Sequence, residues 1–248
     1  RLYPLHFLTL ILVTLAQIIN FNFLGSHQIV GNNDLYRFIL HLFFVSGFEG
    51  ESFNLPIWSV SVEILIYFAF FISIILFAKF GVKYAILIYF ISLLIDKFLF
   101  SSIFVDCFRL FFTGVIVYYI NYSIKRKIYL LPISCFFIFI SFLGNFKIFL
   151  FTPGLLFLFI AFEYFIKSEK KKVLDFFGNL TYSMYLLHIP TMLIIILIFY
   201  NFNLPDAIFL NNYFFIFYIS LILALSFISF KFFEKPVNKL FRKKFLSN

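Results

Sequence analysis

The chain has 248 residues, of which 63% are hydrophobic, 25% are aromatic and only 12% are charged, and its mean hydropathy is +1.04. A soluble domain is nearer half apolar and a quarter charged, so this composition excludes an ordinary soluble domain and predicts an all-α, polytopic membrane helix bundle. The formal charge of +9 would suggest nucleic acid only if the basic residues formed one exposed patch. They lie instead in short loops and in the C-terminal tail, so we expect membrane lipid, and no nucleic acid, as a partner.

Eight apolar runs have the length expected of membrane-spanning helices. A ninth run, Leu35–Ser46, is too short to cross and carries Arg37 and His41 one turn apart, so we expect an interfacial or re-entrant helix there. We expect a single membrane domain over residues 1–248. The eight expected spans, in chain order, are Leu5–Phe23, Pro56–Phe77, Val82–Leu99, Val105–Tyr122, Ile128–Leu143, Ile148–Ile166, Leu180–Tyr200 and Asn212–Phe233.

The positions of the basic residues test this number of crossings. If each of the eight runs crosses once, fifteen of the twenty basic residues fall on one side. The loops on the other side contain only Arg37, Lys97 and Lys147, while Arg109 and Lys231 lie within spans. Because cytoplasmic loops carry the excess of Lys and Arg, the separation predicts eight crossings with both chain ends in the cytoplasm.

The second expected span contains a carboxylate. At helical spacing Ser59, Glu63 and Tyr67 lie on one face, and Trp58 suits the membrane–water interface. An ionised carboxylate at membrane depth costs several kcal/mol, so we expect Glu63 to face the bundle interior and to have a partner. Two readings stay open: a neutral, hydrogen-bonded structural acid, or a carboxylate that orients a catalytic group or binds substrate.

The seventh expected span places Thr181, Tyr185 and His188 on one face. Pro190 has no N–H, so it leaves the carbonyl of Leu186 free and can kink the helix beside His188. A lone histidine in an apolar protein is often a satisfied core residue. The freed carbonyl and the polar neighbours make His188 a candidate for exchanging protons or for holding a phosphate-bearing donor.

The fourth expected span begins with an ion pair. Arg109 lies one turn after Asp106, which fits either a pair at the interface with Arg109 snorkelling or an arginine that points inward. The two cysteines fall in separate apolar runs without zinc spacing, so we expect neither a disulfide nor a metal site. The pattern gives His6 and His27 no role and leaves that of His41 open.

Three segments together resemble one protein family, acyltransferase family 3, the bacterial membrane O-acyltransferases that modify cell-surface polysaccharides and related glycans. Trp58–Glu63 followed by Tyr67 is similar to its W-S-L-S-V-E helix. Gly178–Pro190 resembles its G-x-x-S-Y-S-L-Y-L-x-H-x-P helix, with Thr181 in place of the common serine, and Phe233–Pro236 resembles its closing x-E-x-P. Arg109–Gly114 and Arg1–Pro4 match family segments more loosely.

The resemblance implies a fold of about ten membrane-spanning helices with both ends in the cytoplasm of a bacterial cell. The segment at Arg1 matches the second arginine of the family's R-x-x-R segment, so we expect an N-terminally truncated domain that lacks about two helices. The family's proposed catalytic histidine lies in the first helix, and His188 matches a different family histidine. Residues 1–248 alone are therefore expected to be inactive.

The resemblance also implies a function: transfer of an acyl group, expected to be acetyl, from cytosolic acyl-CoA to a hydroxyl of a cell-surface, exported or lipid-linked glycan. Glu63 and His188 would support catalysis. The donor would bind at Arg1, Tyr185 and His188, and the acceptor side would comprise Trp58, Ser61, Glu63 and Arg109. No bound cofactor is expected. The alternatives are a transporter or flippase for a lipid-linked glycan, in which Glu63, Arg109 and His188 serve as coupling or substrate groups, and a non-catalytic sensor or scaffold.

Overall fold

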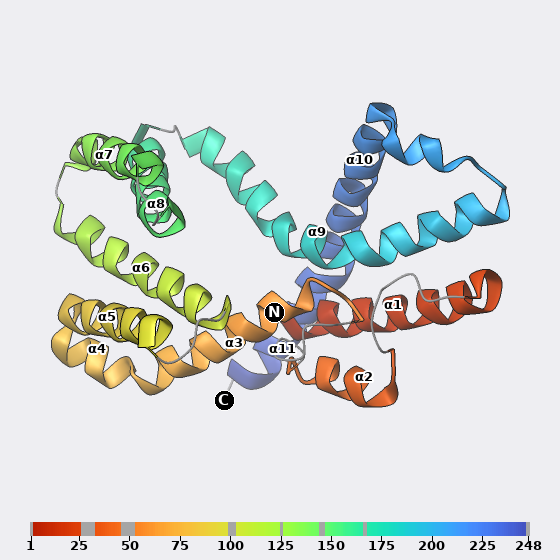
Figure 1. Ribbon diagram of the computed structural model, residues 1–248, viewed down its shortest axis with the longest axis horizontal. Helices are drawn as coiled ribbons and strands as arrows, with labels where there is room; N and C mark the ends of the chain where they lie inside the picture. Colours follow the sequence, from red (N-terminus) through yellow and green to blue (C-terminus); the bar gives the residue numbers. More distant parts are fainter. Residues whose placement is uncertain are drawn as a thin grey trace. The chain divides into compact units, whose positions relative to one another are not determined.

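The computed structural model describes residues 2–25, 33–45, 53–98, 103–124, 126–143, 147–165 and 168–246. Every element in these ranges is a helix, as the composition predicts (Figure 1). The longer helices are α1 (Leu2–Leu24), α2 (Leu35–Leu42), α3 (Ile57–Ile72), α4 (Ile74–Phe80), α5 (Val82–Phe98), α6 (Ile103–Ser123), α7 (Leu130–Leu143), α8 (Lys147–Phe165), α9 (Ser168–Asn201), α10 (Asn212–Ser229) and α11 (Lys235–Leu246). Short turns of other helix types are η2 (Lys127–Tyr129), η3 (Asp206–Leu210) and η4 (Phe230–Glu234).

Fewer of these helices than expected meet the requirements for a membrane span. Within the described ranges, four are long and apolar enough to cross: Leu2–Leu24, Ile103–Ser123, Lys171–Asn201 and Asn212–Phe241. A bent pair, α3 with α4, would make a fifth span. Lys127–Leu143 and Ile148–Glu163 are apolar but shorter. The chain thus has the helices of a membrane protein, while eight crossings remain a prediction.

The second expected span, Pro56–Phe77, is not a single straight helix. It is broken at Ser73 into α3 and α4, whose axes differ by 56°. The Ser73 hydroxyl donates to the carbonyls of Ala69 and Phe70, at 2.8 and 3.1 Å. Such back-bonding by serine competes with the helical ladder and bends helices, which accounts for a break that apolarity alone does not reveal.

The run Leu35–Ser46 contains a short helix, and its expected interfacial or re-entrant position stays a prediction. Helix α2 has only 8 residues and begins at Asp34, whose carboxylate accepts the backbone N–H of Arg37 at 2.8 Å. This is an ordinary N-cap, which satisfies an amide that the helix cannot. A helix of this length, about 12 Å at 1.5 Å per residue, cannot cross a bilayer.

The chain divides into two compact units. A single membrane domain over residues 1–248 stays a prediction. Unit 1 comprises Arg1–Ser61 with Lys172–Asn248, and unit 2 comprises Val62–Lys171. In unit 1, the core is built between α1 and α9. Leu5, Ile57 and Leu186 form one fully buried cluster, and Leu10 and Leu193 belong to a second. Packing of α1 against α9 therefore fixes the rotation of α9 about its own axis, which determines the direction in which the side chains of the candidate site point.

In unit 2, α7 and α8 form a closely packed hairpin, which Figure 1 shows as two adjacent green helices. Ser134 of α7 donates to the carbonyl of Gly154 in α8 at 2.8 Å. A Cβ added to Gly154 would lie 3.1 Å from the backbone N of Ile138 and 3.2 Å from Cβ of Phe137. The absence of a side chain at Gly154 therefore permits the close helix contact, as small residues commonly do between membrane helices.

Candidate functional site

The candidate site lies on α9 in unit 1. Thr181, Tyr185 and His188 all line one cavity of about 370 Å³, as expected from their spacing along the helix. Helix α10 supplies the facing wall, with Tyr218 and Ile222. The cavity volume lies at the lower end of the range for ligand pockets, roughly 300–1,000 Å³.

Hydrogen bonds fix the ring of His188. Its Nδ1 lies 2.7 Å from the carbonyl oxygen of Tyr185, one turn earlier. Because a carbonyl can only accept, Nδ1 donates this bond, and Nε2 is the ring nitrogen that a ligand in the cavity could contact. Tyr218 of α10 donates its hydroxyl to the carbonyl of His188 at 2.7 Å and so ties the facing wall of the cavity to this residue.

The carbonyl that Pro190 sets free has a specific partner. The side-chain amide of Asn54 donates to the Leu186 carbonyl at 3.3 Å, and both residues are fully buried. The sequence predicts the free carbonyl but does not identify Asn54 as its donor. This bond compensates for the missing N–H of Pro190 and anchors α9 two residues from His188.

The hydroxyl of Tyr185 connects α9 to the start of α3. It donates to the carbonyl of Pro56 at 2.9 Å and lies 2.6 Å from the hydroxyl of Ser59. Ser59 itself donates to the same carbonyl at 3.1 Å. The ring of Tyr185 therefore lines the cavity, while its hydroxyl is held by the first turn of α3.

Glu63 has the expected partner but not the expected burial. Tyr67, one turn along α3, donates its hydroxyl to Oε1 of Glu63. The side chain of Glu63 is exposed, whereas the sequence predicted a carboxylate facing the bundle interior. Glu63 lies on an exposed face of α3 in unit 2. Among the described residues, its only hydrogen bond is with Tyr67 of the same helix.

Two other residues assigned to the acceptor side lie nearby in sequence but in unit 1. Trp58 is half-buried at the start of α3. Ser61 is fully buried and donates to the carbonyl of Ile57 at 3.0 Å, so its hydroxyl bonds to its own helix.

Arg109 points inward and does not snorkel. Its side chain is 2% exposed and pairs with both Asp96, at 3.1 Å, and Asp106. The guanidinium also stacks on the ring of Phe149 at 3.9 Å from the centroid. The sequence predicted the bond to Asp106, whereas Asp96 and Phe149 are additions from other helices. Two carboxylates already use the guanidinium, so its role in unit 2 is to hold α5, α6 and α8 together.

The residues predicted to form the site thus fall into three groups. Tyr185 and His188 share the cavity in unit 1, Glu63 pairs with Tyr67 in unit 2, and Arg109 belongs to the ion cluster of unit 2. Arg1, expected to bind the donor, lies outside the described residues.

Glu234 is a buried carboxylate in the segment Phe233–Pro236, which the sequence comparison noted without assigning Glu234 to the site. It is 1% exposed, ends the π-helical turn η4, and accepts the hydroxyl of Ser183 from α9. Ser229 lies 3.4 Å from the same oxygen. Short π segments are often found at functional positions, and an ionisable residue within an apolar span is itself a signal of function. Glu234 therefore holds α9 at Ser183, five residues before His188.

A second missed feature is the polar face of α1. His6, Thr9, Gln17 and Asn20 are all buried on one side of this apolar helix. Nε2 of His6 lies 2.7 Å from the carbonyl of His41, and Nε2 of His41 accepts the backbone N–H of Phe53 at 3.2 Å. Burial, and to a smaller extent the nearby His6, lower the pKa of His41 to about 4. The helical spacing of the four polar residues of α1 could have revealed this buried polar face from the sequence.

No group of three or more His, Cys, Asp or Glu side chains in the described ranges could hold a metal ion. Comparisons of the chain with protein-family models, with curated proteins and with solved structures give no match.

Proposed function

We propose that this protein is an integral membrane O-acyltransferase that moves an acyl group, expected to be acetyl, from cytosolic acyl-CoA to a hydroxyl of an exported or cell-surface glycan. The observation that carries the proposal is the α9 cavity, which His188 lines together with Tyr185 and Tyr218, and in which the Tyr185 carbonyl holds Nδ1 of His188. Its sequence also resembles the acyltransferase helix quoted above. The proposed setting is a bacterial cytoplasmic membrane, with both chain ends on the cytoplasmic side.

In the proposed reaction, a sugar hydroxyl oxygen attacks the thioester carbonyl carbon, the carbon–sulfur bond breaks, and coenzyme A leaves as its thiol. His188 contacts the donor, either accepting a hydrogen bond at Nε2 or, when protonated, donating one to a donor oxygen. Tyr185 and Asn54 are positioning residues because they act through the backbone around His188. Glu63 would accept a hydrogen bond from the acceptor hydroxyl.

The size and the approach of the cavity also fit the donor. A volume of about 370 Å³ suits the acyl-thioester end of acyl-CoA better than the whole nucleotide. Lys172 precedes His188 on the same helix by 16 residues, or about 24 Å at 1.5 Å per residue. A lysine at that distance offers a point charge for the donor phosphates on the proposed cytoplasmic side.

One observation favours transport as the second candidate. The break of 56° between α3 and α4 gives the chain a discontinuous apolar helix, and such helices form substrate sites in many transporters. In that case Glu63 on α3 would contact a lipid-linked glycan during translocation, with no acyl transfer.

The experiment that separates the two candidates uses the purified full-length protein in nanodiscs, because residues 1–248 alone are expected to be inactive, together with radiolabelled acetyl-CoA and the glycan fraction of the source cells. Acyl transfer predicts label in the glycan together with release of coenzyme A thiol. Glu63→Gln should remain monodisperse and lose most of the transfer, whereas Tyr200→Phe, at an exposed position on α9 outside the cavity, should retain it. Translocation of a lipid-linked glycan without any thiol release would reject the acyltransferase.

A further inference from the structure

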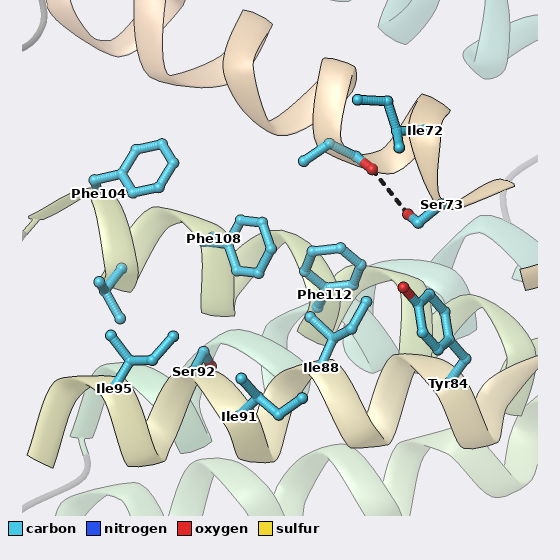
Figure 2. A pocket seen from close by; sticks show the side chains of 12 residues that line it. Ile72, Ser73, Tyr84, Ile88, Ile91, Ser92, Ile95, Phe104, Phe108 and Phe112 are labelled. Atoms are coloured by element: carbon cyan, nitrogen blue, oxygen red, sulfur yellow. Dashed lines mark hydrogen bonds between the residues drawn. The ribbon is translucent and has the colours of Figure 1, made fainter. Parts of the chain in front are cut away.

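A cavity of about 550 Å³ in unit 2 selects no particular ligand. It lies between α3, α5 and α6, and Figure 2 shows Phe104, Phe108 and Phe112 of α6 side by side along it. The hydroxyls of Ser73 and Ser92 in its wall donate to carbonyls of their own helices. None of the described residues that line it is charged, so its chemistry favours an apolar occupant and no more. Helix α11 in unit 1 is different, because it combines apolar and charged side chains.

Helix α11 has a basic side and an apolar side. Its 12 residues contain five lysines and arginines and no acidic residue. At 3.6 residues per turn, four of the five fall within an arc of about 100°, namely Lys235, Lys239, Arg242 and Lys243. An opposite arc of about 140° contains the apolar residues Val237, Leu240, Phe241 and Phe245, with Lys244 as the exception. This separation is typical of a helix that lies at a membrane surface.

Both sides of α11 are open in the described structure. On the apolar side, Leu240 is 67% exposed and Phe241 is 53% exposed. On the basic side, Lys235 and Lys239 are exposed. Two large apolar side chains at consecutive positions are unfavourable in water, so we expect another apolar surface to cover this side of α11.

Helix α11 begins where the last expected span ends. Asn212–Phe233 is about 33 Å long at 1.5 Å per residue, which is enough to cross a hydrocarbon core of about 30 Å. Figure 1 shows α11 leading from the end of α10 toward the C-terminus. In a helix that continued upright, Phe241 would lie about 12 Å beyond Phe233, past a head-group layer of roughly 5–8 Å. An upright α11 would therefore hold Phe241 in water.

The junction between α10 and α11 allows the helix to turn at the membrane surface. The π-helical turn η4 covers Phe230–Glu234, directly before α11. Pro236, in the first turn of α11, has no N–H to donate to the carbonyl of Phe232. Both features are known causes of bends in helices. A bend here lays α11 along the surface, with its apolar side toward the acyl chains and its basic side toward the head groups.

The basic side selects the charge of that surface. Lys235 and Lys243, at its two ends, are about 12 Å apart at 1.5 Å per residue, so the four like charges repel one another unless anions lie among them. Each basic residue near an anionic lipid surface strengthens its attraction about fivefold. An acidic soluble protein or a nucleic acid would pair with the basic side but leave Leu240 and Phe241 in water. A layer of anionic phospholipid matches both sides of α11.

We propose that α11 lies in the head-group layer on the side expected to be cytoplasmic and binds phospholipids with a net negative charge. The lipid phosphates meet the four residues of the basic side, while Leu240 and Phe241 insert among the upper parts of the acyl chains. Phosphatidylglycerol has the required charge, whereas zwitterionic phosphatidylcholine does not. This lipid contact is independent of the acyl transfer proposed above.

The test places a tryptophan on the apolar side of α11. The purified full-length protein carrying Phe241→Trp is reconstituted in phosphatidylcholine nanodiscs, and the signal of the native Trp58 is subtracted with the wild type. Phosphatidylglycerol brominated on its acyl chains, which quenches tryptophan on contact, should reach half-maximal quenching at an at least about fivefold lower mole fraction than brominated phosphatidylcholine. Leu240→Trp reports from the same side, so a folding defect in one variant leaves the other to decide.

Two pairs of lysines provide a matched control. Lys235 and Lys239 are exposed and four residues apart on α11, and Lys79 and Lys83 are exposed at the same spacing in unit 2. Changing the α11 pair to Gln in the Phe241→Trp protein should raise the half-quenching fraction of phosphatidylglycerol at least about fivefold. Changing the Lys79 and Lys83 pair to Gln should leave it within about twofold. Equal effects of the two pairs would overturn the proposal, because the attraction would then follow the net charge of the protein.

Three other results would also overturn it. Equal quenching by the two brominated lipids would remove the selection for negative charge. Emission typical of an indole in water, with no quenching by either lipid, would place α11 away from the membrane and favour an acidic soluble partner. Relief of quenching by inorganic phosphate at constant ionic strength would identify a site for small anions in place of a lipid surface.

Discussion

The bond between Asn54 and the Leu186 carbonyl can be tested by a double-mutant cycle. Pro190 cannot donate to that carbonyl, and the structure provides Asn54 instead, at 3.3 Å and with both residues fully buried. Asn54→Ala should therefore leave a buried acceptor unsatisfied, at a cost of about 1–3 kcal/mol in the free energy of unfolding, in addition to the lost packing of the side chain.

The second change in the cycle restores the helical donor. In Pro190→Ala, the backbone N–H of residue 190 can donate to Leu186 in the ordinary i to i−4 pattern. Asn54→Ala should then cost less in the Pro190→Ala background than in the wild type, by about 1–2 kcal/mol. The part of the loss that comes from packing is the same in both backgrounds and cancels.

The measurement is reversible unfolding in mixed micelles by titration with dodecyl sulfate, followed by far-ultraviolet circular dichroism for the wild type, both single variants and the double variant. Tyr200→Phe combined with Asn54→Ala serves as a control pair, because Tyr200 lies 14 residues from Leu186 and should add independently. Additivity of Asn54→Ala and Pro190→Ala within about 0.5 kcal/mol would refute the assignment of Asn54 as the replacement donor.

Three further predictions concern stability in the same assay. Gly154→Ala should destabilise unit 2 by about 1–3 kcal/mol because its Cβ would press on the backbone of α7. In the control Gly114→Ala, the added Cβ has nothing within 4 Å, so this change should be neutral or stabilising. Similar effects of the two changes would contradict the close contact at Gly154. Arg109→Gln should lower the free energy of unfolding by about 2–4 kcal/mol because Asp96 and Asp106 lose their ion-pair partner. Lys171→Gln, which breaks the exposed pair with Glu163, should lower it by under about 1 kcal/mol. Equal losses would refute burial as the cause. The pKa of His41 is about 4 in the folded chain and 6.5 in the unfolded chain, so the unfolded chain binds the proton first as the pH falls. The free energy of unfolding should therefore fall by ~3 kcal/mol between pH 6.5 and 4. An unchanged pH dependence in His41→Gln would contradict this.

Local spacing predicted much of α9 and little of its surroundings. The shared face of Thr181, Tyr185 and His188, and the free carbonyl at Leu186, follow from helix geometry and from the missing N–H of Pro190. The donor to that carbonyl comes from 132 positions earlier in the chain. Nothing in a local pattern selects Asn54 over other polar residues, because the contact depends on how α1, α3 and α9 pack.

The same distinction applies to the charged residues. The i, i+3 spacing predicted the bond between Asp106 and Arg109, whereas Asp96 joins from another helix and makes the arginine buried. The apolar run around Ser73 predicted a continuous span, because hydropathy does not register a hydroxyl that bonds back to its own helix. Glu63 was expected to be buried only because an ionised carboxylate in contact with lipid costs free energy. Its exposed position, with Tyr67 as partner, depends on which face of α3 is covered by other helices.

The most direct measurement of the proposed donor site is a titration of a non-hydrolysable acetyl-CoA analogue against the purified full chain in nanodiscs. Loss of a hydrogen bond to a charged ligand should make the Kd of His188→Ala about 10- to 100-fold weaker, and Arg1→Ala should follow it. Glu63→Gln and the control Tyr200→Phe should stay within about twofold of wild type, because neither residue lines the α9 cavity. Unchanged affinity in His188→Ala would contradict the donor site, and an equal loss in Glu63→Gln would contradict the division between donor and acceptor groups.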